Sequence, residues 1–474
     1  MNVSFAALLV LSAAAGAAEP APPELRLPET VRPVRQALDL TLDPEAESLT
    51  GTTEIAVEVL ETVPVVWVNA RGLELSAATL DAGSGPTPAR IVPGNDDFVG
   101  FSLAEPLSPG PVTLRVVFEA PISRRELSGV FTMEEAGDRY LFTQFQAIAA
   151  RQAFPCYDEP SAKIPWRVTL RVPSGLVALA NAPAEETWQE EGLTVARFRE
   201  TPPLPSYLLA FAVGPFELVD LGRIGRNRTP SRLVVPRGRG GDTAWAAATT
   251  PRILGLLEDY FDRGYPYAKL DQVTIPGVRF AMEHPGLVTY GQGLVVQRPA
   301  EETLVNRRDW VIYCAHELAH MWFGNLVTME WWDDTWLNEA FAMWMELRIA
   351  DELRPEWGMG LQRVRDRSIA LEADSVSTAR RIRQPIETRH DIRGAFDGIT
   401  YYKGMAVLEM IEAWLGEDVF RQGVNAHIAR HAWGNATAQE LIEEFSRAAG
   451  RDVGPTVSSF LDQVGVPVIS GAVA

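Results

Sequence analysis

Apolar and polar residues alternate along the first half of the chain, a pattern typical of strands with one buried face. The clearest alternating runs are Leu38, Leu40 and Leu42; Ile55, Val57 and Val59; and Val168, Leu170 and Val172. Pro, Gly and Asp residues between the runs mark turns between short strands. The pattern therefore predicts a β-rich domain over roughly the first 220 residues.

The spacing of apolar residues lengthens to the helical period from Thr243 onward. The segments with this period are Trp245–Phe261, Glu302–Phe323, Thr335–Leu353, Gly404–Trp414 and Ala438–Ala449. We therefore expect an α+β multidomain protein in which a β-rich domain precedes a mainly α-helical one.

The polar, basic stretch RIGRNRTPSR, residues 223–232, lies where the two patterns meet. We place the domain boundary there, which gives a β domain over residues 19–222 and a mainly α domain over residues 223–468. Residues 469–474 then form a tail.

The first 18 residues are predicted to be a signal peptide. An apolar run from Phe5 to Leu11 leads into the small residues Gly16, Ala17 and Ala18, although no Lys or Arg precedes the run. The run is too short to span a bilayer, and no other apolar stretch reaches that length. We expect export to the periplasm or the extracellular space, and no integral membrane segment after the signal peptide is removed.

Charge and cysteine content exclude several classes of protein. The formal net charge is −19, which argues against a nucleic-acid partner, because phosphates attract clusters of Lys and Arg. An acidic surface favours cationic ligands only weakly. The two cysteines, Cys156 and Cys314, exclude a disulfide framework and leave open one bridge or two buried thiols.

The stretch CAHELAHMWFGN, residues 314–325, contains two of the six histidines in the chain. On a helix, His316 and His320 lie one turn apart on the same face, so both imidazoles can bind one metal ion. Glu317 lies on the adjacent edge, where it can move a proton without binding the metal. The H-E-x-x-H spacing therefore predicts two zinc ligands and a general base.

A third zinc ligand is expected on the next predicted helix. Glu339 follows His320 by 19 positions, within WWDDTWLNEAFAMW, residues 331–344. Two helices joined by a turn of this length can bring Glu339 back to the histidine pair. Three protein ligands leave one position for water, as in catalytic zinc sites.

These motifs resemble those of the gluzincin aminopeptidases, the family of aminopeptidase N and leukotriene hydrolase. Besides H-E-x-x-H and WLNEAFA, the resemblance rests on FAMEHPG (residues 280–286), YLFTQFQAIAARQAFPCYDEP (residues 140–160) and YYKG (residues 401–404). Together these motifs span most of the chain, and they follow one another in the same order as in the family. The resemblance implies a saddle-like antiparallel β domain followed by a thermolysin-like catalytic domain that binds one Zn²⁺.

The resemblance also implies roles for the matching residues. Glu283 would bind the substrate's α-ammonium group, assisted by Gln146. The backbone at Ala281 and Met282 would align the substrate in an extended form. Tyr401 would donate a hydrogen bond to the oxyanion, or Tyr402 if the register shifts by one residue.

Two residues and the length depart from the family's pattern. Phe280 stands where the family has glycine, so the first substrate pocket could be narrowed. His284 stands where the family has asparagine and could form hydrogen bonds as an amide does. We do not expect His284 to compete for the metal, because three better-placed ligands exist. The chain ends where the family's catalytic domain ends. From this we expect no C-terminal helical domain, and either a more open site or a partner chain that covers it.

Three functions compete at this point. The first is a zinc aminopeptidase that removes single residues from peptides with a free N-terminus. The second is an endopeptidase, against which Glu283 argues because a buried anion disfavours an uncharged internal backbone. The third is a non-catalytic or weakly active peptide-binding scaffold, suggested by Phe280. An epoxide hydrolase side activity follows only from kinship with leukotriene hydrolase. The oligomeric state and the preferred first residue stay open.

Overall fold

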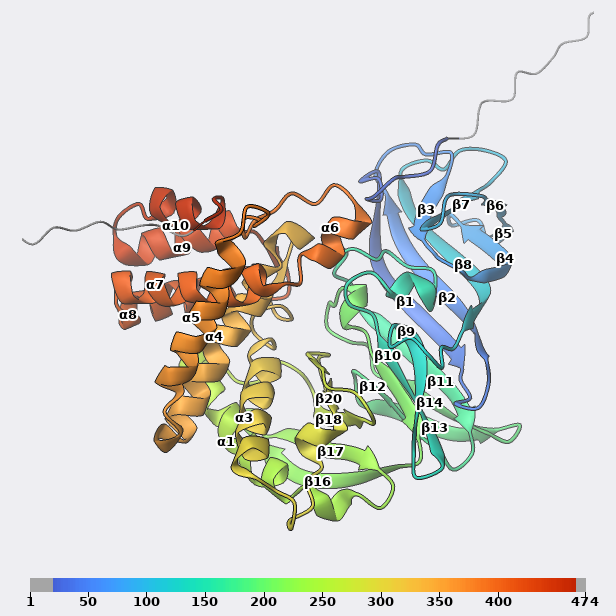
Figure 1. Ribbon diagram of the computed structural model, residues 1–474. Helices are drawn as coiled ribbons and strands as arrows, with labels where there is room; N and C mark the ends of the chain where they lie inside the picture. The colour runs from blue at the N-terminus through green and yellow to red at the C-terminus, as the bar shows by residue number, and fades with distance from the viewer. Residues whose placement is uncertain (1–19, 466–474) are drawn as a thin grey trace, which may run out of the picture.

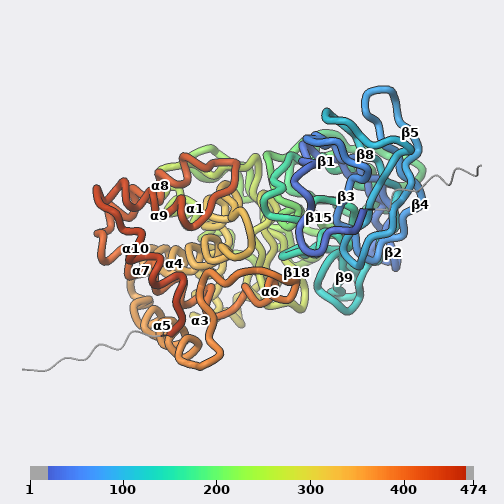
Figure 2. Tube along the Cα trace, turned by 90° about the horizontal axis from the view of Figure 1, so that it is seen from above, coloured from blue at the N-terminus to red at the C-terminus, as the bar shows by residue number. Residues whose placement is uncertain are grey.

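The structure is a computed structural model that describes residues 20–465. The predicted signal peptide, residues 1–18, and the predicted tail, residues 469–474, lie outside the described residues. Two lobes lie side by side in both views, a strand-rich N-terminal lobe and a mainly helical C-terminal lobe (Figures 1 and 2). This arrangement confirms the predicted α+β fold class.

The largest sheet of the N-terminal lobe has eight strands. Its strand order is β13 (Ala184–Glu190), β14 (Leu193–Phe198), β11 (Trp166–Pro173), β1 (Val31–Thr41), β2 (Ser48–Val59), β8 (Gly110–Pro121), β4 (Glu74–Asp81) and β5 (Thr87–Pro88). Neighbouring strands are antiparallel except for β1 and β11, which are parallel. The three alternating runs of the sequence form the adjacent strands β11, β1 and β2.

Two smaller sheets complete this lobe. One has the order β12 (Val177–Ala180), β15 (Phe211–Gly214), β10 (Asp138–Gln144) and β9 (Gly129–Glu135), and the other has the order β3 (Val66–Asn69), β7 (Phe98–Ser102) and β6 (Arg90–Val92). Both sheets are antiparallel.

The C-terminal lobe begins with a five-stranded sheet. Its order is β16 (Phe216–Ile224), β17 (Thr229–Pro236), β18 (Leu270–Ile275), β20 (Leu287–Gly291) and β19 (Ala281–Met282). The predicted boundary after residue 222 therefore falls inside β16, and sheet membership changes near Pro215 instead. The basic stretch 223–232 contains the turn of the β16–β17 hairpin, and an exposed turn has the same polar composition as a linker.

Ten helices occur among the described residues. They are α1 (Ala244–Phe261), α2 (Gln292–Val295), α3 (Leu304–Ala319), α4 (Trp336–Leu353), α5 (Met359–Asp374), α6 (Arg389–Gly394), α7 (Gly404–Leu415), α8 (Glu417–His431), α9 (Ala438–Ala449) and α10 (Gly454–Leu461). The short parallel pair β21 (Thr328–Met329) and β22 (Asn435–Ala436) links the segment after α3 to the segment after α8. The five predicted helices correspond to α1, α3, α4, α7 and α9, which confirms them, although α3 ends at Ala319 rather than at Phe323.

One apolar cluster runs through both lobes. It contains Leu38 and Trp166 of the eight-stranded sheet together with Trp310 of α3 and Trp336 of α4, all nearly inaccessible to solvent. Burial of this much aromatic surface holds the lobes together and fixes the position of α3 against α4.

Both cysteines are buried and free, which agrees with two separate thiols rather than a bridge. Among residues 20–465, none of the helices is long and apolar enough to cross a lipid bilayer.

Candidate functional site

The three predicted metal ligands meet where α3 ends and α4 begins. The Nε2 atoms of His316 and His320 lie 3.6 Å and 3.5 Å from Oε2 of Glu339. The ligand atoms of all three residues lie within 4.8 Å of one another. The structure thus brings Glu339 of α4 next to the two histidines at the end of α3, although a turn separates the two helices in the sequence.

A turn after α3 makes this convergence possible. His320 is the C-cap of α3, and its Nδ1–H donates to the carbonyl of Phe323, 3.1 Å away. Gly324 follows with φ near 113°, a conformation that a residue with a side chain rarely adopts. The chain can therefore reverse and begin α4 beside the histidines, while Nε2 of His320 stays free to bind a metal.

The donor set fits a zinc ion. Zinc binds imidazole nitrogen and carboxylate oxygen at about 2.0–2.2 Å, so neighbouring ligands in a tetrahedral site are about 3.3–3.5 Å apart. The observed separations of 3.5 and 3.6 Å match this spacing. Two imidazoles and one carboxylate also match the ligand types of catalytic zinc sites, which keep a fourth position for water or substrate.

Burial and neighbouring charges give the carboxyl groups of the site different proton affinities. Burial raises the pKa of Glu317 to about 8. Burial acts in the same direction on Glu339, but the imidazoles of His320 and His316 outweigh it and lower the pKa of Glu339 to about 2. Glu339 is therefore anionic, as a carboxylate that binds a metal must be, whereas Glu317 can accept and release a proton near neutral pH.

Glu283 and Gln146 lie on the His320 side of the site. Glu283 forms a second group with Glu317 and His320, in which potential ligand atoms lie within 4.8 Å of one another. The amide Nε2 of Gln146 donates to Oε1 of Glu283 across 3.4 Å. Glu283 is 2% exposed, and no Lys or Arg within residues 20–465 pairs with it. A buried carboxylate that no Lys or Arg neutralises suits a positively charged ligand.

Ala281 and Met282 form β19, the edge strand of the five-stranded sheet. They pair with β20 on one side only, in the register Ala281 with Tyr290 and Met282 with Thr289. The free side of an edge strand can pair with an extended peptide, as the sequence predicts.

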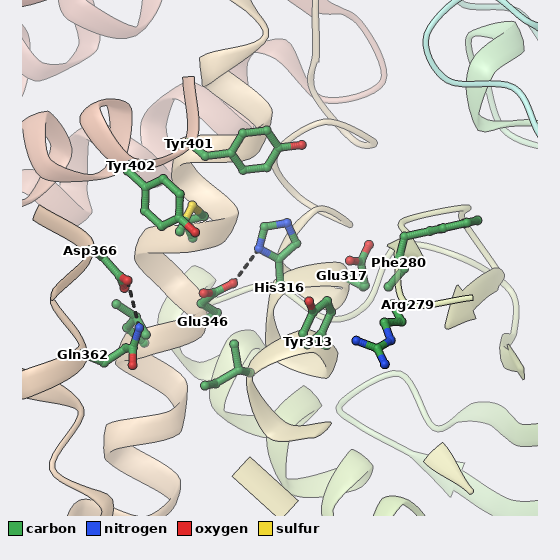
Figure 3. Close-up of a pocket in the computed structure, with 14 residues that line it drawn as sticks. Arg279, Phe280, Tyr313, His316, Glu317, Glu346, Gln362, Asp366, Tyr401 and Tyr402 are labelled. Carbon is green, nitrogen blue, oxygen red and sulfur yellow. Dashed lines mark hydrogen bonds and ion pairs between the residues drawn. The ribbon is translucent and has the colours of Figure 1, made fainter. Parts of the chain in front are cut away.

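Tyr401, rather than Tyr402, faces the three ligands. Both lie in a single turn of π-helix, residues 399–403, that leads into α7. Burial raises the pKa of Tyr401, and so do the nearby carboxylates of Glu339 and Glu283. Tyr402 instead lies close to Asp366 on the other side of the same turn (Figure 3).

The two residues that depart from the family's pattern have separate environments. Phe280 is partly buried and packs against an apolar cluster that includes Phe131 and Val278. The side chain of His284 is fully buried, and burial lowers its pKa to about 3. Within the described part of the chain, His284 joins neither of the two groups that could hold a metal.

Two models of one family match the chain and together span most of it. The Peptidase M1 N-terminal domain matches residues 32–208, and the Peptidase family M1 domain matches residues 245–463. The chain belongs to peptidase family M1. Both matches agree with the division of the molecule into a β-rich lobe and a helical lobe.

Several curated M1 relatives are similar over most of the chain. The Aminopeptidase M1 of Arabidopsis thaliana is 32% identical over 461 residues, which are 95% of this chain and 52% of the relative. The Leucyl aminopeptidase of Saccharolobus solfataricus is 34% identical over 366 residues, which are 76% of this chain and 46% of the relative. The chain thus spans about half the length of the curated relatives it matches.

In this M1 family member, Glu346 is a site residue that sequence reasoning missed. Its Oε2 accepts a hydrogen bond from Nδ1 of His316 at 2.6 Å (Figure 3). Glu346 follows Glu339 by seven residues, two helical turns along the same face of α4, and that spacing was the available signal. The bond orients the imidazole and leaves Nε2 of His316 free for the metal.

Lys163 of the β-rich lobe and Asn325 of the helical lobe support the site, and neither was predicted as a site residue. The Asn325 amide donates to the Glu283 carbonyl at 2.7 Å. The Lys163 ammonium donates to the carbonyls of Asn325, Leu326 and Gly434 at 2.8, 2.9 and 3.0 Å. The β-rich lobe therefore holds the turn that carries Asn325 and, through it, the loop of Glu283.

Proposed function

We propose that the protein is a zinc-dependent aminopeptidase that removes the N-terminal residue from peptides. The observation that carries this proposal is the position of Glu283, a buried carboxylate without a cation, next to the cluster of His316, His320 and Glu339. A carboxylate at a set distance from the metal ligands selects a free α-ammonium group and brings the first peptide bond to the metal. The names of the curated relatives point to the same activity.

His316, His320 and Glu339 would hold the zinc ion. When bound, zinc acts as a Lewis acid toward the scissile carbonyl and lowers the pKa of water to about 7. Glu346 and the carbonyl of Phe323 each accept the Nδ1–H of one imidazole, which keeps both Nε2 lone pairs directed toward the metal.

Glu317 would act as the general base and then as the general acid. Its carboxyl group is buried among the ligands, and its raised pKa suits a group that takes a proton from water near neutral pH. The same proton would then pass to the nitrogen of the leaving peptide. The isosteric change Glu317→Gln removes this basicity and keeps the shape of the side chain.

Tyr401 would stabilise the oxyanion that forms from the scissile carbonyl. Its hydroxyl lies beside the carboxylate of Glu339, at the edge of the ligand cluster. An oriented donor of this kind contributes about 3–4 kcal/mol to the stability of the transition state. The free edge of β19 would hold the substrate backbone extended past this point.

We also propose export of the protein to the periplasm or the extracellular space. The support is the apolar run and the small residues within the first 18 positions. Expression with and without these residues, followed by fractionation and mass measurement of the mature N-terminus, tests this proposal.

A panel of peptides tests the aminopeptidase proposal directly. The protein is prepared with zinc, and hydrolysis of free and N-acetylated versions of one tripeptide is compared by mass spectrometry. We expect hydrolysis of the free peptide only, loss of turnover in Glu317→Gln with zinc still bound, and a larger loss for free than for acetylated peptides in Glu283→Ala. Equal hydrolysis of both peptides by the wild type would contradict the proposal.

A further inference from the structure

A cavity of about 430 Å³ opens beside His316 and Glu317, between α3, α4, α5 and the segment of residues 279–281 (Figure 3). Its apolar lining includes Ile312, Met343 and Leu347 on one wall, and Phe280 and Ala281. The cavity is large enough for an amino-acid side chain and continuous with the cluster of metal ligands.

Asp366 contributes an unpaired buried carboxylate to this cavity. It is 3% exposed, and its Oδ1 accepts a hydrogen bond from Nε2 of Gln362 at 2.8 Å. No Lys, Arg or His in the described part of the chain forms an ion pair with it. Buried aspartates are rare unless they are paired, so the free oxygen of Asp366 lacks a cationic partner that the cavity has room to admit.

The rest of the lining favours the same kind of ligand. Glu346, whose Oε2 already accepts the Nδ1–H of His316, adds a second carboxylate. Tyr313 and Tyr402 add hydroxyl groups that can accept hydrogen bonds. Arg279 also lines the cavity and carries a positive charge. Its side chain is exposed and lies at the opposite side of the cavity from Asp366 (Figure 3). Aliphatic walls that end in a carboxylate match the stem and the charged head of lysine or arginine.

The position of the cavity indicates which substrate residue enters it. Glu283 and Gln146, which would bind the α-ammonium group, lie with His320 and do not line the cavity. The cavity lies instead on the His316 side. A peptide anchored by its N-terminus therefore passes the metal ligands and reaches this cavity with the residue that follows the scissile bond.

We propose that this cavity receives the side chain of the second substrate residue, and that Asp366 selects lysine or arginine there. Asp366 would bind the head of that side chain, and the wall of Ile312, Met343 and Leu347 would cover its stem. The inference rests on the proposed aminopeptidase function and adds a preference at the second position.

Isomeric tripeptides test this preference without a change of net charge. Leu-Lys-Met, Leu-Met-Lys and Lys-Leu-Met have the same composition, so attraction to the acidic protein as a whole is the same for all three. We expect kcat/KM for release of the first residue to be about ten- to a hundredfold higher for Leu-Lys-Met than for Leu-Met-Lys, as a charge-assisted hydrogen bond allows.

The charge of Asp366 is then removed with its shape retained. In Asp366→Asn, the ratio of kcat/KM between Leu-Lys-Met and Leu-Met-Lys should fall to near one. The matched control is Glu372→Gln, which removes one charge from an exposed position of the same helix, α5, and should keep the wild-type ratio. If Asp366→Asn does not fold, Asp366→Glu replaces it and must retain the preference for Leu-Lys-Met.

The outcomes separate this inference from the proposed function. If the wild type cleaves none of the three peptides, the proposed function is wrong. Cleavage of Leu-Lys-Met and Leu-Met-Lys at equal rates overturns the inference alone. A preference for Lys-Leu-Met that disappears in Asp366→Asn also overturns it, because the cavity would then hold the first residue.

Discussion

Removal of the Glu346 carboxylate should weaken metal binding without unfolding the protein. The change Glu346→Ala deletes the acceptor that lies 2.6 Å from Nδ1 of His316 and leaves this Nδ1–H without its partner in a buried site. The imidazole is then free to rotate, so Nε2 is held toward the metal for a smaller share of the time.

Two independent considerations give the size of this effect. A hydrogen bond to a charged group contributes about 1.5–3 kcal/mol, which corresponds to about ten- to a hundredfold in an equilibrium constant. Loss of a residue that orients a metal ligand costs about ten- to a hundredfold in metal affinity in other proteins. We therefore expect the zinc dissociation constant of Glu346→Ala to rise by about ten- to a hundredfold.

Competition with a chromophoric chelator measures this dissociation constant for the wild type and the variant. Glu352→Gln is the matched control, because Glu352 is an exposed acid on the same helix, α4, and should leave zinc affinity unchanged. The melting temperature of the metal-free proteins shows whether the fold is intact. Equal zinc affinity in a folded Glu346→Ala protein would refute the orienting role of Glu346.

Three further changes test the contacts between and within the lobes. Lys163→Met removes one donor from the carbonyls of Asn325, Leu326 and Gly434, of which the last two keep a backbone N–H donor. The urea midpoint of unfolding should therefore fall by the equivalent of about 1–3 kcal/mol. Arg389→Gln removes one half-exposed ion-pair partner of Asp97 and should lower the free energy of unfolding by less than about 1 kcal/mol in the same measurement. A loss of stability equal to that of Lys163→Met would contradict the expectation that the Lys163 contacts contribute more. His427 is buried, and burial lowers its pKa to about 3. As the pH falls, the imidazole of His427 is therefore protonated in the unfolded state before it is protonated in the folded state. Stability should therefore drop by about 2 kcal/mol more between pH 6.5 and pH 5 in the wild type than in His427→Phe, as measured by urea unfolding, and equal drops would show that His427 is not the group responsible.

The two helices that carry the H-E-x-x-H motif and Glu339 could be predicted because their signals are local. The i, i+4 spacing of two histidines and the apolar period around Glu339 are properties of short segments. Helix α9 was likewise predicted with its observed bounds, and its capping box at Thr437 shows why the start was clear.

The elements that the sequence did not reveal depend on tertiary contacts. Helix α5 carries exposed apolar residues, Leu361, Val364 and Leu371, which blur the distinction between its buried and exposed faces. No local pattern marks Asp366, which is buried in the folded protein, where α5 packs against α4 and the π-helical turn at residues 399–403. The boundary between the lobes was displaced because a hairpin turn and a linker have the same polar composition.

The excess of carboxylates explains how metal and substrate binding depend on each other. Glu283, Glu317 and Glu339 are buried close to His320, and burial raises the pKa of both Glu283 and Glu317. Burial therefore disfavours the charged forms of Glu283 and Glu317 until a cation binds beside them. In the proposed function, a zinc ion would compensate Glu339, and an α-ammonium group would compensate Glu283. A substrate with a blocked N-terminus brings no such charge and would leave Glu283 buried without a partner, at a cost that can reach 3–5 kcal/mol, or roughly a thousandfold in binding. The restriction to free N-termini would thus follow from an electrostatic penalty on other substrates as much as from a steric stop.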